Sequence, residues 1–471
     1  EILMQKKLIA LAVAGLASSA AFAQTNVVVY GVADGTFDYV WQSGSKLQSE
    51  TVNTTTDAAG VITAQTTNFS RQDNDVDFTR VSANSSYLGF KGSEDLGNGL
   101  KALFQYETAV NFDSGGGFGA SRDSFVGLSH ANAGTVVLGT LTGPTRALGS
   151  ALDVNPGATG IGANSGLIGK IAGMTLRTPP LAVTRITNPA GTATLETANG
   201  ALSTGCGRSS TCTSIFDTRY NNSIAYLSPN WGGFSFAAAY AANENKTADF
   251  GTVYTTTTNN LTGLSTVTAT PAGANFGQLD TYGYDIGIKW EGMGFMGAVT
   301  YNWVQFGDWA DTEVDNIRVG GMYTAPNWSV RAMWEKTSAD MNNNLLGLSN
   351  TDQQKFGIGG TFSFGKNTLL AQWYGTNSAK SINDSKANLW EVGYLYNFSK
   401  RTMLKATWAM IDNDDGSVAD FGVNAIGNQA ASYNASRLTV TGVGSTTSET
   451  FASSGAGARN QGIQVGIRHS F

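Results

Sequence analysis

The side chains that could do chemistry in this chain are charged residues at alternating positions in extended stretches. Between residues 100 and 112, Lys101 and Glu107 fall on one face of such a stretch, while Phe104 and Tyr106 fall on the other, because side chains two apart on a strand share a face. One face is apolar and the other carries charge. The pattern is typical of transmembrane strands, which are apolar toward lipid and polar toward a lumen where charges act on ions and solutes.

The same parity gives candidate lumen residues along the whole chain. Arg122 is one of them, although it falls on the same face as Val126, which a bulge or a subunit contact would explain. The other wall cations are Lys101, Arg219, Lys289, Arg318, Arg331 and Lys405, and the wall anions are Asp34, Glu107, Asp285, Glu335 and Glu391. The long segment 142–217 adds Arg146, Asp153, Lys170, Arg177 and Arg185 as constriction candidates.

Catalysis, cofactors and bound metals are not expected. His130 borders a predicted turn and His469 lies next to the carboxyl end, and these are the only histidines, so neither is placed as a general base beside a nucleophile. The stretch 412–416 reads DNDDG and is rich in oxygen ligands, but its spacing does not match a calcium loop. It predicts a solvated turn, and calcium binding is left open.

Two cysteines, Cys206 and Cys212, stand in the polar stretch GCGRSSTC. In an exported protein such a pair is expected to form a local disulfide, which closes a small loop and stabilises it by about 2 kcal/mol. A metal pair is the alternative, and it is disfavoured because both histidines are distant in sequence.

The amino-terminal residues have the features of an export signal. Residues 1–3 read as an upstream remnant, and from Met4 the chain has Lys6, Lys7, an apolar run over 8–16 and a small-residue site ending at Ala23. This pattern predicts a secretory signal peptide over 1–23, which leaves 24–471 as a single domain. Since no later apolar run approaches the roughly 18 to 20 residues of a spanning helix, a membrane protein of this composition would cross with closed strands. The formal net charge of −6 and the lack of a basic tract argue against nucleic acid as a partner.

The fold expected is an all-β, antiparallel transmembrane barrel of about sixteen strands, an even number as bacterial single-chain barrels have. The predicted strands are 26–40, 82–92, 100–112, 122–130, 135–141, 218–227, 233–242, 282–290, 295–306, 314–324, 328–337, 355–364, 368–376, 388–398, 403–411 and 459–471. Asn98-Gly99 suits a tight turn. Short turns such as Pro326-Asn327 and Lys366-Asn367 are expected on the periplasmic side, and the long Thr/Asn/Gly segments on the outside.

Several motifs resemble the trimeric general porins of Gram-negative bacteria, in particular their beta-proteobacterial and neisserial-type branch. They are VYGVAD at 29–34, LGFKGSEDLG at 88–97, LKA at 100–102 with FQYE at 104–107, FVGL at 125–128, and the terminal Phe471. The resemblance implies a homotrimer in the outer membrane, in contact with lipid and lipopolysaccharide. It also implies a third loop folded into each lumen, passive diffusion of ions and small hydrophilic solutes, and Phe471 as an assembly signal for the barrel-assembly machinery.

Two departures from the family pattern leave alternatives open. The family usually has Leu-Gly-Arg after its fifth strand, whereas this chain has Leu138-Gly139-Thr140, so the ion preference is left undecided. The segment 142–217, at roughly 75 residues, is far longer than ordinary loops. Its apolar piece at 166–174 would pack as a plug or add two strands, so an eighteen-stranded solute-selective channel is an alternative, as is an added role as a surface adhesin.

Overall fold

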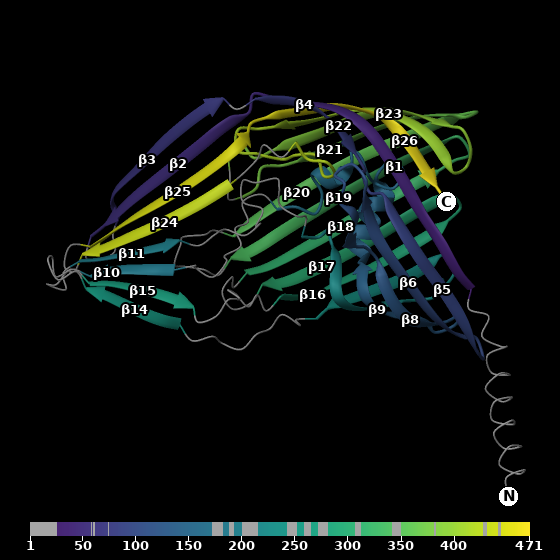
Figure 1. The fold of residues 1–471 in the computed structure, drawn as a ribbon, viewed down its shortest axis with the longest axis horizontal. Helices are drawn as coiled ribbons and strands as arrows, with labels where there is room; N and C mark the ends of the chain where they lie inside the picture. Colours follow the sequence, from purple (N-terminus) through teal and green to yellow (C-terminus); the bar gives the residue numbers. More distant parts are fainter. Residues whose placement is uncertain are drawn as a thin grey trace, which may run out of the picture.

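The computed structural model describes residues 26–57, 59, 62–73, 75–171, 182–187, 193–199, 215–242, 252–258, 265–271, 281–306, 312–341, 350–380, 383–426, 431–440 and 444–471. The predicted signal peptide over 1–23 lies outside these residues. The described chain is almost entirely antiparallel strands, arranged as a barrel with a second sheet beyond one end (Figure 1). In the part of the chain that the structure describes, no helix has the length and apolarity to cross a membrane.

The barrel is closed and has sixteen wall strands, as predicted. Two of them are interrupted, so that β4 continues as β5 and β7 continues as β8, and β26 pairs with β1 to close the wall. The wall strands are β1 (Asn26–Ser43), β4 (Val76–Ser82), β5 (Tyr87–Gly97), β6 (Leu100–Asn111), β7 (Gly117–Ser121), β8 (Ser124–His130), β9 (Gly134–Thr142), β12 (Arg219–Leu227), β13 (Phe234–Ala241), β16 (Thr281–Gly292), β17 (Phe295–Phe306), β18 (Thr312–Thr324), β19 (Trp328–Met341), β20 (Thr351–Phe364), β21 (Asn367–Thr376), β22 (Ala387–Asn397), β23 (Thr402–Asn413) and β26 (Arg459–Ser470). The eighteen-stranded alternative is therefore wrong.

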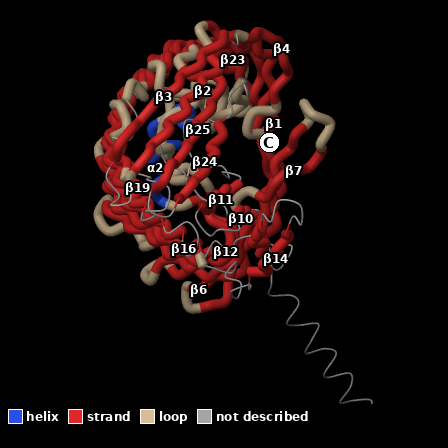
Figure 2. Tube along the Cα trace, turned by 90° about the vertical axis from the view of Figure 1, so that its left-hand side faces the viewer, coloured by secondary structure: helices blue, strands red, loops and turns tan. Residues whose placement is uncertain are grey.

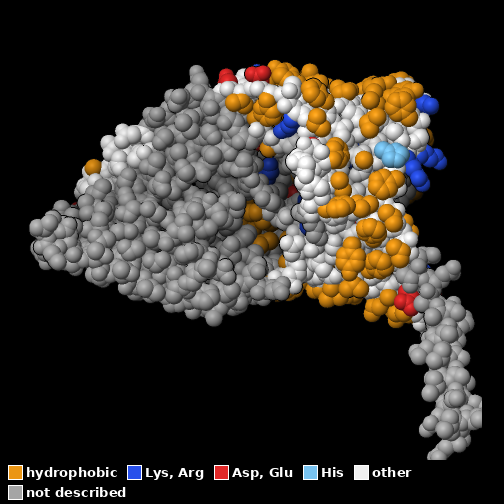
Figure 3. Space-filling view, viewed as in Figure 1, with side chains coloured by type: hydrophobic (Ala, Val, Ile, Leu, Met, Phe, Trp, Pro, Cys, Tyr) orange, Lys and Arg blue, Asp and Glu red, His pale blue; other side chains and the backbone are white. Residues whose placement is uncertain are grey.

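Side-chain alternation gives this wall an apolar outside. In β26, Ile463, Val465 and Ile467 are about half exposed on the outer face, while Gln464 is buried inside the barrel. Figure 3 shows hydrophobic side chains gathered over the outer surface of the barrel. This apolar band is the surface that a lipid bilayer covers in a transmembrane barrel.

Short turns lie at one end of the barrel and long connections at the other. At the first short turn, Asn98 and Gly99 both have positive φ, +52° and +79°, as the mirror-image hairpin turns require. The carboxyl end is fixed by two backbone hydrogen bonds between Phe471 and Gly31, at 3.1 and 3.2 Å. Both ends of the barrel wall thus meet at one seam.

A second sheet, not predicted from the sequence, is built from the long connections. Its order is β14, β15, β10, β11, β24, β25, β2, β3. These strands are β2 (Lys46–Thr56), β3 (Ile62–Asp73), β10 (Ala182–Thr187), β11 (Ala193–Asn199), β14 (Thr252–Thr258), β15 (Ser265–Pro271), β24 (Ala431–Val440) and β25 (Gly444–Ala456). Four hairpins from four different connections thus join edge to edge. Viewed from that side, the sheet lies in front of part of the barrel mouth (Figure 2).

One connection, residues 143–171, fills part of the barrel interior and is called the inserted loop here. It contains helix α2 (Pro144–Leu152) and a short 3₁₀ turn, η1 (Asn164–Gly166). Proline at the first helical turn suits α2, because that position has no intrahelical hydrogen bond to lose. Leu148 and Leu152 of α2 pack with Ile161 and Ile168 in the main buried cluster, which holds the loop against the wall strands β16 to β19.

Candidate functional site

The space left beside the inserted loop is a cavity of about 590 Å³. Four of its lining side chains are cationic and two are anionic. They are Arg122, Arg146, Lys170 and Arg219, with Asp123 and Asp217. Part of the lining comes from the connection after β23, through Phe421, Gly422, Val423 and Ala425. All four cations are among the residues that strand parity and the long loop had singled out.

Two of the four cations are held by carboxylates on the wall. The Arg122 Nε lies 3.4 Å from Glu107 Oε2, and the guanidinium stacks over Tyr87 at 4.7 Å. The Arg219 Nε lies 3.0 Å from Asp123 Oδ1. These two arginine side chains are about one-fifth exposed, so water in the cavity screens each pair and leaves both cations accessible to solutes.

The other two cations, Arg146 and Lys170, belong to the inserted loop. In the described residues neither side chain makes a hydrogen bond or an ion pair within 4 Å. The carboxylate that acts most on Arg146 is Asp217, and those that act on Lys170 are Asp420 and then Asp217. Asp217 is itself bonded to Arg318, at 3.1 Å. Burial lowers the pKa of Lys170 to about 8, so this amine is still mostly cationic at neutral pH. The cavity therefore has a surplus of positive charge.

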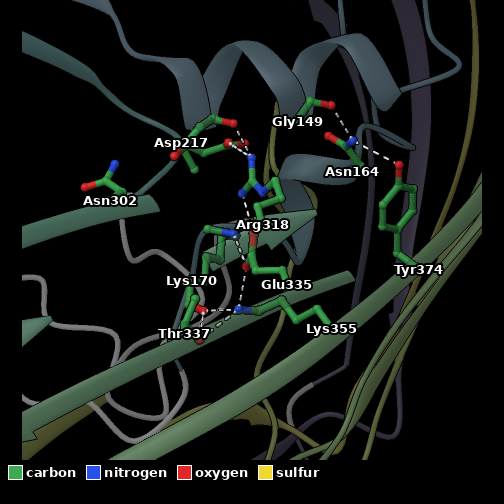
Figure 4. Close-up of polar contacts among 12 residues, drawn as sticks. Gly149, Asn164, Lys170, Asp217, Asn302, Arg318, Glu335, Thr337, Lys355 and Tyr374 are labelled. Atoms are coloured by element: carbon green, nitrogen blue, oxygen red, sulfur yellow. Dashed lines mark hydrogen bonds and ion pairs between the residues drawn. The ribbon is translucent and has the colours of Figure 1, made fainter. Parts of the chain in front are cut away.

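A buried chain of charges holds the inserted loop to the wall (Figure 4). Arg318 on β18 donates to Glu335 on β19 at 2.7 Å and to Asp217 at 3.1 Å. Lys355 on β20 donates to the other oxygen of Glu335 at 2.8 Å. The backbone N–H of Gly169 also donates to Glu335, at 2.8 Å. Because Arg318, Glu335 and Lys355 are fully buried, they are anchors of the loop and do not face water.

The start of α2 is tied down by the same part of the wall. Asp285 on β16 accepts hydrogen bonds from the backbone N–H and the hydroxyl of Thr145, at 3.0 and 2.6 Å. A carboxylate at this position satisfies an unpaired N–H of the first helical turn and complements the positive end of the helix dipole. Arg318 also donates to the Thr145 carbonyl, at 2.6 Å. Asp285 and Arg318 thus fix the helix from opposite sides of one residue.

The end of α2 is tied down by a cluster of carboxylates and amides. Asp153 accepts from the backbone N–H groups of Asn155 and Asn164, at 2.8 and 2.7 Å. The side-chain amide of Gln372 on β21 donates both to Asp153 and to Glu391 on β22, at 3.2 and 2.7 Å. Arg331 on β19 donates to the carbonyl of Asp153. Figure 4 shows Asn164 reaching both the Gly149 carbonyl and the Tyr374 hydroxyl.

The remaining candidates lie elsewhere. Asp34 is buried between Lys405 and Arg468, at 2.5 and 2.9 Å. Lys289 is half exposed and pairs with Glu291 at 3.0 Å. Lys101 is exposed close to the first short turn. Arg185, predicted at the constriction, instead belongs to β10 of the second sheet. Arg177 and the predicted disulfide between Cys206 and Cys212 lie outside the described residues.

Parity reasoning missed some charged residues that matter here. Asp38 and Arg80 face each other across β1 and β4, with Arg80 Nε 3.2 Å from Asp38 Oδ2. Asp38 shares the parity of Asp34, so extending the rule by four residues would have included it. Asp123 and Asp217 lie just before the first residues of β8 and β12, outside the alternating pattern, so strand parity does not predict where their side chains point.

The oxygen-rich stretch 412–416 is the root of an inward-running segment. Asp412 pairs with Arg459 at 2.8 Å, and the buried Asn413 accepts from Ser417 Oγ and from the N–H of Ala419, both at 2.8 Å. Asp414 and Asp415 are exposed, as a solvated turn predicts. Among the described residues, no three His, Cys, Asp or Glu side chains are grouped so that they could hold a metal ion.

Comparisons with known proteins show which family this barrel resembles. A family model described as Gram-negative porin matches residues 10–416. The outer membrane porin protein 32 of Delftia acidovorans is 29% identical over 470 residues, covering 99% of this chain and 100% of that protein. The major outer membrane protein P.IA of Neisseria meningitidis serogroup C is 52% identical over 52 residues, which are 11% of this chain and 13% of that protein.

Solved structures show the same fold. The anion-selective porin from Comamonas acidovorans aligns with a TM-score of 0.57 at 23% identity, covering 95% of this chain and 100% of that chain. The barrel, its apolar outer band, its inserted loop and the family match agree with one another. The chain belongs to the Gram-negative porin family, in its beta-proteobacterial and neisserial-type branch, and forms an outer-membrane channel for passive diffusion of ions and small hydrophilic solutes.

Proposed function

We propose that this channel favours anions and that Arg146 is the main residue behind the preference. The observation that carries the proposal is that Arg146 lines the cavity without a hydrogen bond or ion pair in the described part of the chain. Arg122 and Arg219 are each balanced by one carboxylate. Arginine stays protonated at any pH that the protein meets, so Arg146 contributes a fixed positive charge at the passage.

The wall around Arg146 strengthens this charge. Lys170 adds a second cation without an ion pair in the described residues, and Asp217, which acts electrostatically on both cations, is already bonded to the buried Arg318. An ion of either sign passes close to this lining, and rings of basic side chains favour anions in narrow pores. The solved porin from Comamonas acidovorans is described as anion-selective. For the present chain the same preference is inferred from its own charges.

The test is the reversal potential of single channels in a planar bilayer under a salt gradient. Arg146→Glu reverses the charge at the cavity, so the reversal potential is expected to move toward cation preference. Lys101→Glu makes the same charge change at an exposed site near a short turn and serves as the matched control, with a small shift expected. An Arg146→Glu channel with the wild-type reversal potential would contradict the proposal.

We further propose that three copies assemble as a homotrimer, embedded in lipid and lipopolysaccharide and delivered by the barrel-assembly machinery. Support comes from the family and from the apolar outer band. Conductance steps in groups of three are the expected record of a trimer.

The terminal residue Phe471 is proposed as the assembly signal. Its backbone bonds to Gly31 at the seam where the barrel closes, so its loss removes two hydrogen bonds as well as an aromatic end. Deleting Phe471 is expected to leave export intact and to block membrane insertion. Gels of outer-membrane fractions measure this, and heat-sensitive trimers at wild-type levels would refute the role.

A further inference from the structure

A second segment also enters the barrel and lines part of the same cavity. It follows β23 over residues 414–426 and is called the strap here. Its root is fixed by Asn413, whose side chain donates to the carbonyls of Ala419 and Ala458 at 2.9 and 2.8 Å. Asn460 on β26 donates to the Ala419 carbonyl as well, at 3.0 Å. A buried loop keeps its backbone groups paired in this way, and the strap therefore has a defined path.

The middle of the strap packs on the inserted loop. Phe421 and Ile426 are buried in the same cluster as Leu167 and Ile168 of that loop. Gly422 lies so close to the loop that a Cβ on it would overlap the backbone of Ser165 and Gly166. Only glycine allows this approach, because the opposing atoms are backbone and have little freedom to move. The strap and the inserted loop therefore form one continuous lining.

The far end of the strap is held by Arg80 on β4. The guanidinium donates to the carbonyl of Ala425 at 2.7 Å and to that of Asn424, while its Nε pairs with Asp38 at 3.2 Å. The Asn424 side chain also donates to Asn84, at 2.9 Å. Arginine suits this tether, since its planar fork presents several donors in fixed directions. A cation that could have faced the channel is thus used to hold the strap.

We propose that the strap is a second constriction element, which sets the size limit of the channel while the basic side chains of the cavity set its ion preference. The same cavity that Arg122, Arg146 and Arg219 line is also lined by four strap residues, Phe421, Gly422, Val423 and Ala425. The lining that these strap residues offer is backbone and apolar side chains, with no charge. A permeating solute therefore passes both basic and uncharged parts of this lining, and the width of the passage depends on where the strap is held.

The first experiment asks whether the strap borders the conducting path. Ala425 is exposed and lines the cavity, so Ala425→Cys, in a background with Cys206→Ser and Cys212→Ser, places one small thiol there. Treatment with 2-sulfonatoethyl methanethiosulfonate adds bulk and a negative charge. A lower single-channel conductance after treatment is the expected result. Ala131→Cys, the same change at an exposed short turn, is the matched control and is expected to conduct as before.

The second experiment asks whether the position of the strap sets the size limit. Gly422→Val is expected to push the strap from the inserted loop, which changes the single-channel conductance and the largest neutral sugar admitted in liposome-swelling assays. Gly297→Val makes the same change where no atom lies within 4 Å of the added Cβ, and it is expected to behave as wild type. Gels that show heat-sensitive trimers establish that each variant has assembled.

Each outcome decides the proposal. An assembled Gly422→Val channel with wild-type conductance and sugar limit would overturn it, as would an Ala425→Cys channel that conducts unchanged after its thiol has been modified. If Gly422→Val does not assemble, the thiol modification of the Ala425→Cys channel decides alone. These readouts are conductance and solute size, so they are independent of the ion preference tested at Arg146.

Discussion

Two parts of the barrel wall carry inward charges at the same strand parity, yet those charges do different work. On β18 to β20 the charges of Arg318, Glu335 and Lys355 lie beneath the inserted loop, fully buried and bonded to one another. On β12 and next to β8, Arg219 and Arg122 face the cavity with water around them. Whether a wall charge is an anchor or a guide for solutes depends on whether the loop covers it.

Breaking the covered part should have the largest effect. Glu335 stands between two buried cations, so Glu335→Gln leaves Arg318 and Lys355 with too little negative charge, and loss of one member of a buried ion pair costs about 3–5 kcal/mol. The measurement is denaturant unfolding in detergent. Glu313→Gln, at an exposed site on β18, is the matched control and should change stability little. Equal stability of the two variants would show that burial does not distinguish the two parts.

The open part should respond in ion preference and hardly in stability. Asp123 pairs with Arg219 at a partly exposed site, where such pairs contribute about 0–1 kcal/mol. Asp123→Asn leaves Arg219 unopposed, so the reversal potential should move further toward anion preference, opposite to the shift expected for Arg146→Glu. A shift of Asp123→Asn toward cations would contradict the assignment of this wall as the charged side of the passage.

The smallest effect expected is a pH dependence at Lys170, which lies where the two parts meet. Burial lowers the pKa of this amine to about 8. Lys170 is therefore cationic below pH 8 and loses its charge as the pH rises through 8, so anion preference should fall between about pH 7 and 9. Reversal potentials across that range measure the change. Lys170→Arg stays charged and should remove the dependence, and a wild-type channel with constant preference would refute it.

Strand parity predicted the wall strands because the alternation of apolar and polar residues within one strand is enough to show which face is turned to lipid and which to the lumen. The inward positions of Glu107 and Arg219 could be predicted from the alternation of their own strands alone. The tight turn at Asn98-Gly99 could be predicted from the residue types of the turn alone. The cover over Arg318 could not be predicted in this way, since it depends on contacts with Asp217 and Gly169 that are distant in sequence. Local pattern therefore located the inward charges without separating the covered ones from the open ones.

The strap escaped prediction for a related reason. Residues 412–416 read as a polar turn, and the single aromatic Phe421 that follows gives no periodic signal. Two contacts fix the segment. The guanidinium of Arg80 donates to the carbonyls of Asn424 and Ala425, and Gly422, which has no side chain, lies against the backbone of the inserted loop. Contacts with backbone leave no complementary pattern of residue types for sequence reasoning to find.

The second sheet has a consequence for how the outer surface can change over generations. Its four hairpins are joined by backbone pairing, as in β25 with β2 and β11 with β24, and backbone pairing tolerates nearly any residue type apart from proline. Substitutions that avoid proline therefore leave the backbone pairing and its registers in place. Adding a single residue to a paired strand is different, because it would turn every following side chain to the opposite face. The second sheet can thus vary by substitution more readily than by length.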